Sequence, residues 1–263
     1  MSFQGSGGSS TQDMPTIVMT HGAFCAGWAF EAFRAPFEAQ GWTVLAPDLP
    51  GHGEGGSVAG LSMSDYARSL VRLCEGLPER PVLLGHSMGG LVSQMAARRI
   101  APAALVLLAP SPPWGVTGSS IEEAITAFGV HLVDPFWSSA VTPDRHLMRH
   151  HSLDRTPKAR RDAILARLRP ESGRAVREVL NWWLDPFMTT SVGAGPLPHP
   201  SLVFAGDRDV VHPTATVRQT AERIGGELRV MPGMSHWLIG EEGWEDVAEA
   251  TLGWLESRAR VSV

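Results

Sequence analysis

Cysteine is scarce in this chain. Its 263 residues include two cysteines, Cys25 and Cys74, which are too few and too far apart for a disulfide framework or a zinc site. We favour two free thiols over a single disulfide and therefore expect a cytoplasmic protein. No apolar run approaches the roughly 20 residues that a membrane-spanning helix needs. No basic segment followed by an apolar one marks a secretory signal near the amino terminus.

Basic charge is also in short supply. The formal net charge is −5, whereas a nucleic-acid partner calls for a clustered basic surface and an anionic membrane calls for a polybasic segment. Both partners are therefore excluded, and a small-molecule ligand is expected. A hydrophobic fraction of 43% and a charged fraction of 19% are typical of a soluble globular protein with a substantial core. The sequence carries no signal of oligomeric state.

Short apolar runs alternate with longer helical patterns along most of the chain. Near-continuous apolar strands separated by helices are typical of a parallel sheet covered on both faces. We therefore predict an α/β fold with a mostly parallel sheet of about six strands flanked by helices. The predicted strands are 16–20, 43–46, 82–84, 105–109, 202–205 and 228–231. The predicted helices between them are 28–40, 64–75, 90–100, 213–224 and 243–258.

The alternation stops between residues 112 and 200. This stretch has no convincing strand, and its helical patterns lie at 121–128, 143–151 and 158–184. A helical insertion after a sheet strand is typical of a cap over the carboxyl ends of the strands, where open α/β sheets bind their ligands.

Three segments follow from this pattern. Residues 15–111 and 201–263 are predicted to form one core, and residues 112–200 are predicted to form a helical cap. Residues 1–14 are rich in glycine and serine, which indicates a flexible leader or an expression remnant.

The motif Gly85-His86-Ser87-Met88-Gly89 joins an apolar run to a helical pattern. Strand, sharp turn and helix with a serine at the turn is typical of a nucleophile elbow, which exposes the hydroxyl above a parallel sheet. The flanking glycines remove side chains where backbones approach closely. A structural serine in a tight turn is the less favoured interpretation of Ser87.

A serine hydroxyl needs a base to take its proton, and the base needs an acid to orient it. Two later segments supply both groups. Gly206-Asp207-Arg208-Asp209 follows the strand predicted at 202–205, and Gly233-Met234-Ser235-His236 follows the strand predicted at 228–231. A parallel sheet brings such strand ends to one edge. We predict that Ser87, an aspartate and His236 form a catalytic triad.

These motifs resemble those of the α/β-hydrolase fold family, from about Thr16 to Leu255. The segments His21-Gly22-Ala23-Phe24 and Asp48-Leu49-Pro50-Gly51-His52-Gly53 also carry the resemblance. In this family the acid usually stands three residues after the glycine that ends its strand. That position selects Asp209 as the acid, with Asp207 as the alternative.

The beginning of the chain is similar to the plant methylesterase and hydroxynitrile lyase branch, through His21-Gly22-Ala23-Phe24-Cys25-Ala26-Gly27-Trp28. His86 and Met88, which flank Ser87, fit ordinary esterases better than the lyases. The resemblance therefore implies a serine hydrolase that cleaves a carboxylic ester or a related acyl compound through an acyl-enzyme, without a metal or an organic cofactor. The backbone amides of Ala23 and Met88 would form its oxyanion hole.

Several alternatives stay open at this point. A lactonase, a thioesterase, a C–C bond hydrolase and a hydroxynitrile lyase would use the same triad, and a ligand receptor would keep the same fold. The substrate is expected to be determined by the cap, which the resemblance does not specify. Phe24 and Trp114 are the candidate substrate-binding residues, since Trp114 directly follows a predicted strand end. For any single tryptophan of the cap, packing is the favoured role.

The remaining histidines are assigned structural roles. His21, His52 and His86 lie in loop motifs without a carboxylate motif to orient them, so we expect them to hold loops by hydrogen bonds. His146 and His150 lie four residues apart, with His151 adjacent. Since a metal site needs at least a third convergent ligand, we favour a solvated helix face there.

Overall fold

The computed structural model describes residues 16–117 and 139–259. Six strands form one sheet in the order β2-β1-β3-β4-β7-β8, and every neighbouring pair is parallel. The predicted α/β fold with a parallel six-stranded sheet is confirmed. The strands are β1 (Ile17–Thr20), β2 (Val44–Leu45), β3 (Val82–His86), β4 (Ala104–Leu108), β7 (Ser201–Gly206) and β8 (Glu227–Met231).

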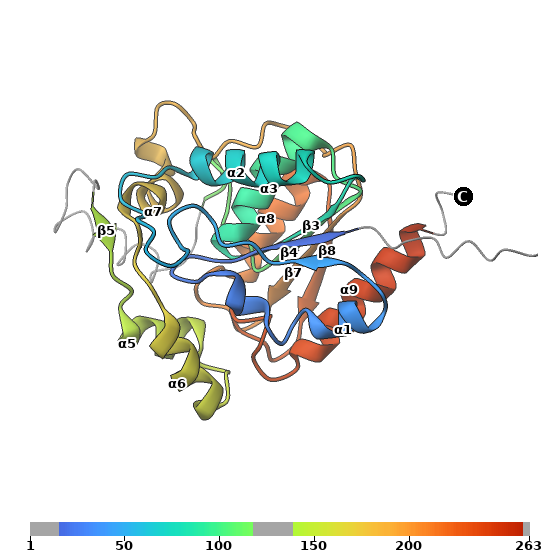
Figure 1. The fold of residues 1–263 in the computed structure, drawn as a ribbon. Coiled ribbons are helices and arrows are strands. Elements are labelled where there is room, and N and C mark those ends of the chain that lie inside the picture. Colours follow the sequence, from blue (N-terminus) through green and yellow to red (C-terminus); the bar gives the residue numbers. More distant parts are fainter. Residues whose placement is uncertain (1–15, 118–138, 260–263) are drawn as a thin grey trace, which may run out of the picture.

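Helices cover both faces of the sheet (Figure 1). One face carries α2 (Met63–Glu75), α3 (Met88–Ile100) and α8 (Thr214–Ile224), and the other carries α1 (Ala35–Ala39) and α9 (Trp244–Ala259). Each face has its own apolar core, one centred on Tyr66 and Leu91 and the other on Phe33 and Trp254. Every residue of β1, β3, β4 and β7 is therefore buried, which explains their continuous apolar runs.

The helix predicted at 28–40 is wrong as a single element. The chain forms the 3₁₀ turn η1 (Gly27–Phe30), then a turn, and then the short helix α1 with a proline in its first turn. Because Pro36 has no backbone N–H to donate to the preceding turn, it is tolerated at a helix start and not in a helix interior.

The segment between β4 and β7 is here called the insertion, and its described parts lie at the carboxyl end of the sheet (Figure 1). The expectation of no strand in it is wrong, because β5 (Ala140–Val141) and β6 (Glu171–Ser172) form a short antiparallel pair. The helical pattern 121–128 lies outside the described residues. The other elements are α5 (Arg145–Leu147), the π-helical turn η2 (Met148–Ser152), α6 (Lys158–Arg167), α7 (Gly173–Leu180) and the 3₁₀ turn η3 (Trp182–Leu184).

The helix predicted at 158–184 is thus divided into three. α6 ends before Pro170, since the residue that precedes a proline disfavours the helical conformation. A new helix, α7, begins after Ser172, whose hydroxyl accepts the Ala175 amide at 3.3 Å as an N-cap. In the described parts of the chain, no helix combines the length and apolar character needed to cross a bilayer.

Candidate active site

Ser87 occupies the turn between β3 and α3. Its φ of 52° lies in the left-handed region, which is strained for a residue with a side chain. Close backbone contacts hold the turn: a Cβ at Gly89 would lie 2.2 Å from the Thr20 carbonyl oxygen, and one at Gly85 would lie 2.4 Å from the Gly89 carbonyl oxygen. Only glycine fits at these two positions, and this explains the spacing of the motif.

The structure brings Ser87, His236 and Asp209 together. Ser87 Oγ lies 3.0 Å from His236 Nε2, and His236 Nδ1 lies 2.9 Å from Asp209 Oδ2. Each residue follows the end of a parallel strand, namely β3, β8 and β7. Asp207, the alternative acid, is exposed and accepts the Gly233 amide at 2.7 Å instead.

Asp209 is held as a buried acceptor. Its Oδ1 accepts the backbone amides of Val211 and His212, at 2.8 and 2.9 Å. Burial alone would raise the pKa of Asp209, but the neighbouring His236 and His212 outweigh it and hold the pKa below its usual value. A carboxylate that accepts from Nδ1 of His236 leaves Nε2 able to accept the Ser87 hydroxyl proton.

The loop after β1 lies directly against the serine. A Cβ at Gly22 would lie 3.1 Å from the Ser87 Cβ, and Ala23, Phe24 and Met88 all line the same cavity as Ser87. Met88 is the first residue of α3, so its amide is among those that have no partner within a helix. The residues predicted to form an oxyanion hole therefore lie beside the serine.

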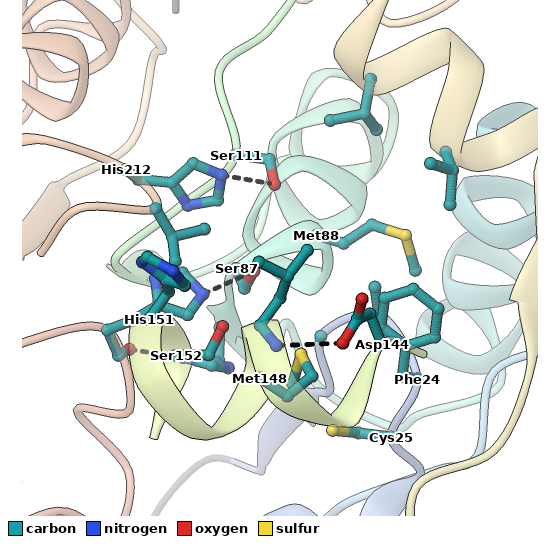
Figure 2. Close-up of a pocket in the computed structure, with 18 of the residues that line it drawn as sticks. Phe24, Cys25, Ser87, Met88, Ser111, Asp144, Met148, His151, Ser152 and His212 are labelled. Carbon is teal, nitrogen blue, oxygen red and sulfur yellow. Dashed lines mark hydrogen bonds between the residues drawn. The ribbon is translucent and has the colours of Figure 1, made fainter. Parts of the chain in front are cut away.

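Figure 2 shows the cavity around these residues. The volume of this cavity is about 440 Å³. The insertion supplies much of its apolar wall, including Leu147, Met148, Val176 and Val179. Such a cavity suits a ligand with a substantial apolar group.

Trp114 is not among the residues that line this cavity. Its indole Nε1 donates to the Asp185 carbonyl at 3.3 Å, and its ring packs edge-on against Trp182 with centroids 5.3 Å apart. The structure therefore places Trp114 outside the lining of this cavity, and its contact with a substrate stays a prediction. The indole instead packs within the insertion, and nothing in the local sequence distinguishes these two environments.

His21 and His86 connect loops, as predicted. His21 Nε2 accepts the Leu49 amide at 3.0 Å, and His86 Nε2 donates to the His236 carbonyl at 2.9 Å. Burial lowers the pKa of His21 to about 4 and that of His86 to about 3. Both rings are therefore neutral near pH 7 and act as fixed hydrogen-bonding groups.

The expectation that His52 has no orienting carboxylate is wrong. Glu171, a completely buried residue of the insertion, accepts from His52 Nε2 at 2.9 Å and from the Tyr66 hydroxyl at 2.6 Å. Burial opposes ionisation of both partners, but their mutual contact raises the pKa of His52 and lowers that of Glu171. Since these residues are 119 positions apart, no local pattern could have indicated the pair.

Metal binding has little support among the described residues. Their one cluster with three possible ligands is Asp209, His212 and His236, and these side chains already bond to one another, to Ser87 or to the Ala109 carbonyl. His146 and His150 have ring centroids 4.5 Å apart, but within the described residues no third ligand joins them.

Comparisons with known proteins bear on the family and the fold of this chain. The chain is 38% identical over 76 residues to a pyrethroid hydrolase of Sphingobium wenxiniae, which is 28% of this chain and 27% of that protein. It is 28% identical over 257 residues to the magnesium-chelatase 30 kDa subunit of Rhodobacter capsulatus, covering 93% of this chain and 88% of that protein.

Among solved structures, a methylesterase from Arabidopsis superposes with a TM-score of 0.71 at 18% identity, covering 92% of this chain and 99% of that one. This match supports the fold. The model of the alpha/beta hydrolase family matches residues 17–250. The chain therefore belongs to the alpha/beta hydrolase family.

Proposed function

We propose that this protein is a serine hydrolase that cleaves carboxylic esters through an acyl-enzyme. The observation that carries the proposal is the continuous hydrogen-bonded chain from Ser87 Oγ through His236 to Asp209, at 3.0 and 2.9 Å, on the wall of an apolar cavity. Serine, histidine and a buried carboxylate in this order form the constellation that activates a hydroxyl for acyl transfer.

The proposed reaction uses each residue in turn. Ser87 Oγ attacks the ester carbonyl carbon while His236 Nε2 takes its proton, and Asp209 stabilises the imidazolium that forms. Collapse of the tetrahedral intermediate breaks the bond to the alcohol, which receives the proton from His236. Water then attacks the acyl-enzyme with His236 as base, which releases the acid and restores Ser87.

Two amide donors are proposed to stabilise the oxyanion, namely those of Ala23 and Met88. Their position beside Ser87 and the start of α3 at Met88 support this role, because first-turn amides and the helix dipole favour negative charge. The insertion is proposed to act as a cap that determines the substrate, since Leu147, Met148 and Val176 come from it.

Two of the proteins matched above support a hydrolase that acts on esters, whereas the relative that covers 93% of this chain is named as a magnesium-chelatase subunit. Of the two, one is named for pyrethroid hydrolysis and the other, a structural neighbour, is a methylesterase. Neither name identifies the acid or the alcohol for this chain, because one fold supports many substrates. The proposal is therefore limited to the chemistry, with a ligand of substantial apolar size.

The test is hydrolysis of p-nitrophenyl esters of increasing acyl length by the wild type and by Ser87→Ala. We expect turnover well above one per minute for the wild type, within the usual enzyme range, and a loss of at least 10³-fold for the variant. A fluorophosphonate probe should label the wild type and not Ser87→Ala. Ser257→Ala removes an exposed serine of α9 and should keep both properties. Slow turnover that Ser87→Ala does not reduce would contradict the proposal and favour a receptor.

A further inference from the structure

A second serine–histidine pair lies beside Ser87. The amide of Ser111, which follows β4, donates to the Ser87 carbonyl at 3.0 Å. The amide of His212 donates to Asp209 Oδ1 at 2.9 Å. Both side chains are 3% exposed and both line the cavity, where Ser111 Oγ lies 3.3 Å from His212 Nε2 (Figure 2).

The protein fixes how this pair shares its protons. His212 Nδ1 lies 3.0 Å from the Ala109 carbonyl oxygen. A carbonyl can only accept, so Nδ1 carries a hydrogen, and in the Nδ1–H tautomer Nε2 is an acceptor. The Ser111 hydroxyl therefore donates to Nε2, and the remaining lone pairs of Ser111 Oγ are available to a donor.

The pair is close to the atoms that are proposed to react. The His212 ring stands edge-on to the His236 ring, with centroids 5.0 Å apart. The same cavity is also lined by apolar side chains, including Val176, Val179 and Leu180. In a cavity of this kind, a few polar groups determine how a ligand is oriented.

We propose that Ser111 and His212 form a subsite for a hydroxyl group that the substrate carries near its ester carbonyl. This inference rests on the proposed esterase function and names the substrate class as hydroxy esters. The ligand hydroxyl donates to Ser111 Oγ, while the Ser111 hydrogen stays on His212 Nε2. An ester without this hydroxyl leaves the internal bond between the two side chains intact, so discrimination is about tenfold, far below that of a site left with an unpaired polar group.

Binding to Ser87→Ala protein tests the subsite without turnover. One matched pair places the hydroxyl on the acyl side, as methyl mandelate against methyl phenylacetate. The other places it on the alcohol side, as 2-hydroxyethyl against propyl phenylacetate. We expect the hydroxyl to lower the Kd about tenfold in at least one of the two ester pairs. The pair that shows this effect identifies whether the subsite binds a hydroxyl on the acyl side or on the alcohol side of the ester.

Three additional substitutions in the Ser87→Ala background locate the effect. Ser111→Ala should reduce the preference to less than twofold. His212→Asn keeps a donor for the Ala109 carbonyl but removes the Nε2 acceptor, and it should also reduce the preference. Ser152→Ala removes another hydroxyl from the same cavity and should leave the preference unchanged. Thermal unfolding of each protein identifies a variant that fails to fold. If either Ser111→Ala or His212→Asn fails to fold, the Kd ratios of the other variant test the subsite.

The outcomes separate the two proposals. A Kd ratio near one for both ester pairs, or a tenfold preference that survives Ser111→Ala and His212→Asn, would overturn the subsite. The hydrolysis of the same four esters by the protein with Ser87 intact is measured separately. A hydroxyl preference in binding without any hydrolysis would contradict the esterase and leave the subsite standing. Hydrolysis without a hydroxyl preference in binding would support the esterase and contradict the subsite.

Discussion

Oε2 of Glu171 lies 2.9 Å from Nε2 of His52, and both side chains are completely buried. Glu171 belongs to the insertion, whereas His52 follows β2 in the core. The same carboxylate oxygen accepts the Phe24 amide at 3.4 Å, next to Ala23 of the proposed oxyanion hole. The pair therefore connects the insertion to the loop that lies against Ser87.

Removal of the Glu171 charge should destabilise the fold. Glu171→Ala leaves His52 and the Tyr66 hydroxyl without their acceptor, so we expect a loss of about 3–5 kcal/mol in the free energy of unfolding. Urea denaturation measures this loss. The control is Glu31→Gln, which breaks the exposed pair of Glu31 with Arg167 and should change stability by less than about 1 kcal/mol. Equal losses for the two variants would contradict a special role for the buried pair.

The contribution of this pair should depend on pH in a defined direction. The pKa of Glu171 is lowered in the folded state. Its contribution to the free energy of unfolding is therefore present above the ordinary glutamate pKa of 4.5 and is lost as the pH falls through the folded-state pKa. The pKa of His52 is raised in the folded state. Its contribution to the free energy of unfolding is therefore full below the ordinary histidine pKa of 6.5 and is lost as the pH rises through the folded-state pKa.

The stability difference between the wild type and Glu171→Gln should therefore be largest between about pH 5 and 6.5 and should shrink on both sides. His21, whose ring centroid is 4.9 Å from that of His52, has a pKa of about 4 and stays neutral across this window. Urea unfolding at half-unit steps of pH measures the difference. A difference that is constant from pH 4 to 9 would rule out the ion pair as its source.

Glu241 should limit stability at high pH. It is completely buried, its Oε1 accepts the Ser235 amide at 2.8 Å, and burial raises its pKa to about 8. The folded state keeps the carboxyl proton of Glu241 up to about pH 8, whereas the unfolded state releases it above the ordinary glutamate pKa of 4.5. The free energy of unfolding therefore falls as the pH rises towards 8.

Glu241→Gln keeps an oxygen for the Ser235 amide and removes the ionisation. We expect it to equal the wild type near pH 4.5 and to exceed it by a few kcal/mol at pH 8. Thermal unfolding in a pH series compares the two proteins. Parallel curves across the series would show that Glu241 does not titrate in this range.

Asp209 and Asp207 should differ sharply in their effect on catalysis. Asp209→Asn places an amide against His236 Nδ1 and favours the wrong tautomer, so we expect kcat to fall by about 10⁴-fold. Asp207→Asn changes a side chain that contacts the Gly233 amide and should change kcat by less than about threefold, as is usual for surface positions. Steady-state kinetics on one p-nitrophenyl ester compares them, and a larger loss for Asp207→Asn would reverse the assignment.

The parts of the site that sequence reasoning located are those that local chemistry determines. The turn at Ser87 needs glycine at fixed positions, and Asp209 and His236 follow apolar strands whose ends must meet at one edge. Glu171 could not be found in this way, because its partners lie far away in the chain and its own surroundings carry no motif. The packed position of Trp114 could not be predicted for a related reason: an aromatic side chain after a strand end fits a cavity wall and a packed insertion equally well.

The order of strands in the sheet has a consequence for synthesis of the chain. Ser87 and His236 are 149 residues apart, and the sheet places β4 and β7 between β3 and β8. A ribosome therefore delivers the proposed nucleophile long before its proposed base, and contacts of such large sequence separation form late and slowly. On the proposed mechanism, the Ser87 hydroxyl of the nascent protein therefore stays without its base until the last strand joins the sheet.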